Sequence, residues 1–153
     1  MLVDIKGPMV LRMILAIQGL MFISVASAQE LISSAPGDAR AYFIQPADGQ
    51  VIETMDDSGV EIIFGLMGMD VSPAGMVVPN SGHHHLLINM DQLPDLNLPL
   101  PATDQVRHFG KGQTSTKISL PPGKHRLQLL LANHIHIPHS PAVMSEVIEI
   151  EVK

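Results

Sequence analysis

The chain of 153 residues is 46% hydrophobic and 16% charged, which suits one domain and is too short for two separate cores. Lys and Arg number 9 against 15 Asp and Glu and form no cluster, so nucleic acid is not an expected partner. There is no cysteine, which excludes disulfides and leaves His, Met, Asp and Glu as side-chain ligands for a metal.

Residues 1–28 predict a secretory signal peptide. Two basic residues precede an apolar run at 13–25, which is short for a membrane span, and Ala28 provides a small residue for cleavage before Gln29. We therefore expect a periplasmic protein that has no membrane span after cleavage. An uncleaved membrane anchor is the alternative, because basic residues before an apolar run also orient such an anchor in the membrane.

The mature chain is predicted to begin with a flexible segment at 29–40, which is polar, contains Pro and Gly and has no regular period. A single β-domain is expected to fill 41–153. Its apolar residues alternate with polar ones in several short runs, the pattern of half-buried strands. The predicted strands are 41–44, 51–52, 60–66, 81–90, 114–120, 125–133 and 146–152.

Two connections shape the predicted topology. Three prolines at 91–101 exclude a helix or a central strand, which suits a crossing from one sheet to another. Residues 107–114 contain two glycines and are expected to form a turn. No amphipathic helix pattern follows the signal peptide, so we predict an all-β, Ig-like antiparallel β-sandwich of about seven strands, with a cupredoxin-like barrel as the alternative.

The strand at 81–90 begins with three consecutive histidines. In an extended strand, His83 and His85 share one face at a separation of roughly 6–7 Å, whereas His84 lies on the other face with Leu86 and Ile88. His83 and His85 are therefore a candidate pair of metal ligands.

A second histidine cluster lies at 134–139. If it is extended, His134 and His136 share a face, and His139 follows three residues later. Convergence of the two clusters, with a contribution from the 107–114 turn, would complete a metal site. The main candidate ligands are His83, His85, His108, His136 and His139, and the secondary candidates are His84, His134 and Met69.

Copper is the preferred ion, with zinc as the alternative. Imidazole suits both metals, copper(II) binds a given set of ligands more tightly than zinc(II), and methionines precede the histidine strand. Two other functions stay open. The histidines can order loops in a non-catalytic structural or adaptor domain that has no cofactor, or an enzyme can use an open metal position. No serine triad, cysteine nucleophile or His-Glu-x-x-His helix is present.

Four segments taken together resemble the domain-of-unknown-function 4399 (DUF4399) family of small exported bacterial proteins. These segments are 82–88, 108–114, 122–125 and 136–139. The resemblance covers roughly residues 41–152. It implies an exported, single-domain protein, and it implies no biochemical activity.

Overall fold

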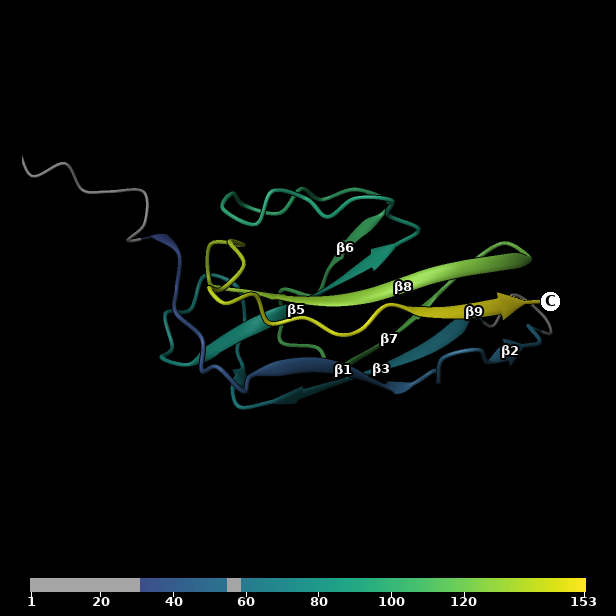
Figure 1. Cartoon of the computed structure of the whole chain (residues 1–153), viewed down its shortest axis with the longest axis horizontal. Helices are drawn as coiled ribbons and strands as arrows, with labels where there is room; N and C mark the ends of the chain where they lie inside the picture. Colours follow the sequence, from purple (N-terminus) through teal and green to yellow (C-terminus); the bar gives the residue numbers. More distant parts are fainter. Residues whose placement is uncertain (1–30, 55–58) are drawn as a thin grey trace, which may run out of the picture.

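The computed structural model describes residues 31–54 and 59–153, so the predicted signal peptide lies outside the described residues. These ranges contain nine strands and no α-helix (Figure 1). The strands are β1 (Arg40–Gln45), β2 (Val51–Ile52), β3 (Val60–Met67), β4 (Asp70–Val71), β5 (Ser81–Ile88), β6 (Val106–His108), β7 (Ser115–Ile118), β8 (Gly123–Ala132) and β9 (Ile148–Val152).

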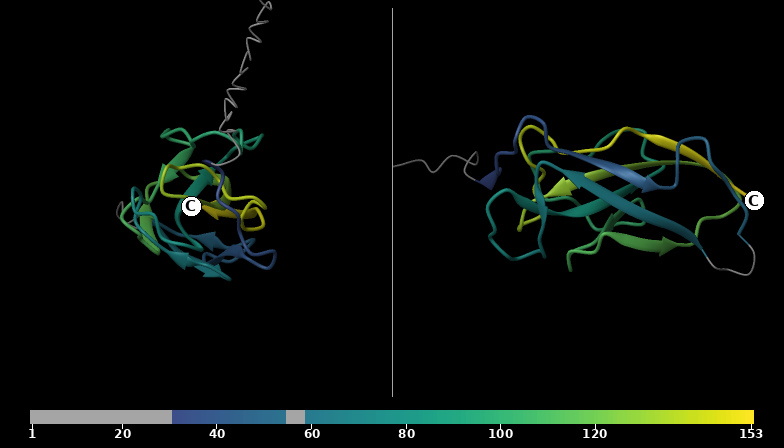
Figure 2. Two further views of the ribbon diagram at one scale, coloured as in Figure 1. Left: turned by 90° about the vertical axis from the view of Figure 1, so that its left-hand side faces the viewer. Right: turned by 90° about the horizontal axis from the view of Figure 1, so that it is seen from below.

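The strands form two sheets, which lie as layers in Figures 1 and 2. One has the order β1-β3-β7, and the other has the order β2-β9-β8-β5-β4 with β6 paired to β5. The prediction of an all-β protein is confirmed. The sequence predicted antiparallel sheets. The pairs β2–β9 and β4–β5 are parallel, so the larger sheet is mixed and this part of the prediction is wrong. The Ig-like strand order and the cupredoxin-like alternative stay predictions.

The main core lies between the sheets. Ile62 and Phe64 of β3 pack in one buried cluster with Leu86 of β5 and with Leu127 and Leu129 of β8. The alternation that predicted these strands places every second side chain in this core. Burial of this apolar surface is the main force that holds the two sheets together.

Strand β5 is buried on both faces, along its whole length. Its outer face packs in a second cluster, in which Leu87 and Leu130 contact Leu100 and Leu96 of the connection after β5. This connection was predicted to cross between sheets, and that prediction is wrong: it covers the outer face and returns to β5 through β6. The apolar outer face of β5 requires such a cover.

The predicted turn at 107–114 begins as a strand. In β6, Val106, Arg107 and His108 pair with Leu87, Leu86 and His85 of β5. The chain turns only after His108 and then enters the smaller sheet at β7. Three residues are too few to show an alternating pattern, which is why the sequence did not reveal this strand.

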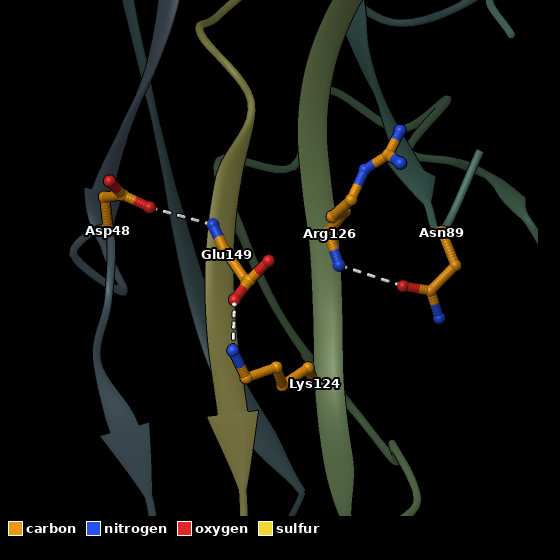
Figure 3. Close-up of polar contacts among 5 residues, drawn as sticks. All are labelled: Asp48, Asn89, Lys124, Arg126 and Glu149. Carbon is orange, nitrogen blue, oxygen red and sulfur yellow. Dashed lines mark hydrogen bonds and ion pairs between the residues drawn. The ribbon is translucent and has the colours of Figure 1, made fainter. Parts of the chain in front are cut away.

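Polar contacts attach the flanking turns to β8 and β9 (Figure 3). The carboxylate of Asp48 accepts a hydrogen bond from the backbone N–H of Glu149 at 2.8 Å, and Asn89 Oδ1 accepts one from the N–H of Arg126 at 2.9 Å. The ion pair of Lys124 with Glu149, at 3.0 Å, is exposed and contributes little to stability. The two backbone contacts therefore do more to hold the residue after β5 against β8 and the turn before β2 against β9.

The described part of the N-terminal segment lies against the loop that follows β8. The N–H of Ala35 donates to Ser140 O at 3.1 Å, and the N–H of Ser140 donates to Ser33 O at 3.0 Å. Residues 33–35 are therefore attached to this loop, and the flexibility of 29–40 stays a prediction. Within 31–54 and 59–153, no helix has the length and apolar character needed to cross a membrane.

Candidate metal centre

Four imidazole rings meet at one end of the larger sheet. His83 and His85 come from β5, His108 from β6, and His136 from the turn after β8. The distances between ring centroids run from 4.6 Å, for His108 and His136, to 6.0 Å, for His85 and His136. One ligand atom from each of His83, His85 and His108 lies within 4.8 Å of the others. We call these four residues the histidine cluster.

Strand geometry places three members of the histidine cluster. His83 and His85 lie on the outer face of β5, because successive side chains of a strand alternate. His108 is the direct partner of His85 in the β5–β6 pair, and their ring centroids are 5.2 Å apart. The predicted convergence of His108 with the triplet thus arises from strand pairing.

The fourth member, His136, comes from a turn rather than from the extended segment considered above. The side-chain oxygen of Asn133 accepts hydrogen bonds from the N–H groups of Ile135 and Ile137, both at 3.1 Å. The backbone at His136 has a φ of 70°, in the left-handed region. His134 and His136 therefore do not form a second strand-like pair, and His136 alone joins the cluster, with Nε2 3.1 Å from Nε2 of His108.

We expect Asn133→Ala to weaken both the fold and any metal binding by His136. The substitution leaves the N–H groups of Ile135 and Ile137 without their acceptor, which should lower the free energy of unfolding by about 1–3 kcal/mol. The control is Ser33→Ala, because Ser33 Oγ accepts a hydrogen bond from the side-chain Nδ2 of Asn133, at 3.1 Å, and the backbone contact of Ser33 O with Ser140 is kept. Urea unfolding and metal titration of both variants test this. Equal metal affinity in Asn133→Ala and the wild type would contradict it.

The inner pair of the cluster is buried. His83 and His85 are 0% and 1% exposed, and none of their four ring nitrogens has a hydrogen-bond partner of good geometry in the described part of the chain. A poorly aligned contact of the His85 ring with the backbone of His83 is too weak to count as one. Burial, together with the neighbouring imidazoles, lowers the pKa of His83 to about 4 and that of His85 to about 3. Both rings are therefore neutral at pH 7, the form that binds metals.

The outer pair faces the solvent. His108 is exposed and His136 is half-buried, so the cluster reaches the surface on this side. Burial and the nearby His136 ring lower the pKa of His108. A tetrahedral zinc ion with bonds of about 2.0–2.1 Å holds its nitrogens about 3.3 Å apart, and a square-planar copper(II) ion holds neighbouring nitrogens about 2.8 Å apart. The Nε2 atoms of His108 and His136 are 3.1 Å apart, which is close to both spacings. The ligand atoms of His83, His85 and His108 are up to 4.8 Å apart, so these three rings must move closer together to bind one ion.

His139, a main candidate in the sequence, lies beside the cluster, with Nε2 engaged and Nδ1 buried without a partner in the described part of the chain. Its Nε2–H donates to Ser81 O at 3.2 Å, and its ring packs against the backbone of Gly82. Burial lowers its pKa, so this ring is also neutral at pH 7. It lines β5 next to His83 rather than joining the four grouped rings.

The secondary candidates are not among the four grouped rings. His84 points into the main core, where its ring centroid is 5.1 Å from that of Phe64, and burial lowers its pKa to about 4. His134 lies in the turn after β8, and its carbonyl accepts a hydrogen bond from Gly75. Met69 lies between β3 and β4.

Sequence reasoning missed the supporting role of Asn133. An asparagine two residues before a turn position is a recognisable signal, because its side chain commonly accepts from the N–H two residues on. The predicted strand at 125–133 placed Asn133 at the strand end, where it could have been considered as a turn former. The contact between its side chain and the backbone that carries His136 is visible only in the structure.

Comparison with known proteins gives one match. The family model described as a domain of unknown function, DUF4399, matches residues 62–153, a stretch that includes the whole histidine cluster and begins within β3. No curated protein and no solved structure matches the chain.

Proposed function

The chain belongs to the DUF4399 family, and we propose that it is an exported metal-binding protein whose ion is held by the histidine cluster. The observation that supports this most is the burial of four unpaired nitrogens on His83 and His85. A buried polar atom without a partner costs about 1–3 kcal/mol. A metal ion bound between the rings would give one nitrogen of each ring a partner.

The same protein shows what a structural histidine looks like. The ring of His125 is buried, and both of its nitrogens have partners: Nδ1 accepts from Asn89 Nδ2 at 3.0 Å, and Nε2–H donates to Pro121 O at 2.8 Å. The structural alternative predicts such pairing throughout the cluster. It accounts for the contact between His108 and His136, and it does not account for His83 and His85. Because His84 in the main core also lacks partners on both ring nitrogens, the support comes from unpaired nitrogens on rings that lie against two further imidazoles.

Copper is the ion that we propose, with zinc as the alternative. The donors of the cluster are neutral imidazoles, which bind copper(II) more tightly than zinc(II) in the Irving–Williams order. Four imidazoles form the cluster, so the preference rests on this order.

We expect the protein to be periplasmic, to begin at Gln29 and to contain about one metal ion per chain. Untagged protein from the periplasmic fraction should be tested by intact mass and elemental analysis, because a histidine tag would add its own ligands. Added copper or zinc at about 100 times its dissociation constant should stabilise the fold by about 2.7 kcal/mol. A chain without bound metal, whose melting temperature neither ion raises, would favour the structural alternative.

A further inference from the structure

The ring of His108 lies directly on the backbone of Gly110. A Cβ atom added at Gly110 would lie 2.3 Å from Cε1 of His108 and 2.4 Å from its Nε2, far inside van der Waals contact. This Nε2 is the same atom that lies 3.1 Å from Nε2 of His136. The outer half of the histidine cluster therefore occupies the space that any side chain at position 110 would fill.

We propose that Gly110 is a positioning residue of the metal centre, which holds the imidazole of His108 in the ligating position because it has no side chain. This inference rests on the proposed metal-binding function and names a residue that contacts no ion itself. A larger residue at 110 would turn the ring of His108 away from His83, His85 and His136.

The ring must give way because the backbone on either side is held. Gly110 O accepts a hydrogen bond from the N–H of Ala74 at 2.9 Å, and the N–H of Phe109 donates to His84 O at 3.1 Å. The added Cβ would also lie 3.3 Å from Cβ of Ala74, which is tight and needs only a small shift. The imidazole is the free end of a rotatable side chain, so its rotation relieves the clash at the lowest cost.

A need for an unusual backbone conformation does not explain this glycine. Gly112, two residues later, has a φ of 77°, which favours glycine, whereas Gly110 is not among the residues with positive φ. Alanine is therefore compatible with the backbone at 110. We expect Gly110→Ala to keep the fold and the wild-type melting temperature while it changes the metal centre.

The test compares metal affinity in Gly110→Ala with that in Gly37→Ala, whose added Cβ would meet nothing within 4 Å. Gly110→Ala should weaken copper or zinc binding roughly 10- to 100-fold, the usual cost of disturbing a residue that orients a ligand. In a His108→Ala background the same substitution should change affinity by less than about twofold, because the two changes act through one ring. Gly37→Ala should bind like the wild type.

A measurement on the metal-free protein separates this inference from the proposed function. Nuclear Overhauser contacts between the ring of His108 and those of His83 and His136 should be present in the wild type and absent in Gly110→Ala. The positioning role alone is overturned if Gly110→Ala binds metal as tightly as the wild type. It is also overturned if the ring contacts are still present in Gly110→Ala. If the wild-type protein binds neither copper nor zinc, the proposed function is overturned. The ring contacts then still show whether Gly110 sets the position of the His108 imidazole.

Discussion

Joint replacement of His83 and His85 by leucine is expected to abolish specific metal binding. The two rings supply the buried half of the cluster, and only the solvent-facing His108 and His136 would remain. Two imidazoles leave a metal ion under-coordinated, so the loss should exceed the roughly 10- to 100-fold that substitution of a supporting residue costs. Leucine keeps the volume of the site, and it matches Leu87, which packs on the same face of β5.

The matched control for this experiment is His84→Leu. His84 lies between the two ligands in sequence, points into the main core beside Phe64, and should not affect metal binding. Isothermal titration with copper and with zinc measures the affinities, and urea unfolding shows whether each variant is folded. Replacing buried histidines without partners by leucine should leave the metal-free fold at least as stable. Wild-type affinity in the double variant would contradict the proposed centre.

The metal-free domain is expected to unfold on mild acidification. Burial lowers the pKa of His83 and His84 to about 4 and that of His85 to about 3 from the ordinary value of 6.5. Between pH 6.5 and about 4, the unfolded chain therefore binds protons on these three rings that the folded chain does not bind. Stability falls as pH falls through this window, and it is fully present above pH 6.5.

The magnitude of this acid effect is large. Each such histidine lowers the free energy of unfolding by about 1.4 kcal/mol for each pH unit below 6.5, or by about 3 kcal/mol at pH 4.5. Three of them cost on the order of 8 kcal/mol, which is comparable to the whole stability of a typical domain, about 5–15 kcal/mol. Urea unfolding of metal-free protein from pH 7 to pH 4.5 measures it. His84→Leu should reduce the slope by about a third, and a stability independent of pH would contradict the prediction.

The amino-acid sequence by itself determined the local features. The alternation at 60–66 and 125–133 predicted β3 and β8, because the period of two follows from strand geometry alone. The same geometry placed His83 and His85 on one face and His84 on the other. The resemblance to the DUF4399 family was also readable from the chain and is confirmed over residues 62–153.

Only the tertiary structure decided which histidines meet. His108 joins the cluster because β6 pairs with β5 in a register that sets it opposite His85, and three residues carry too little pattern to predict that pairing. His136 joins because Asn133 bends the chain out of the extended form, whereas His139 is drawn to Ser81. These contacts link residues far apart in sequence or depend on one side chain bonding to a turn. Their free energies depend on side-chain packing and strand register, and the spacing of neighbouring residues in the sequence does not reveal either.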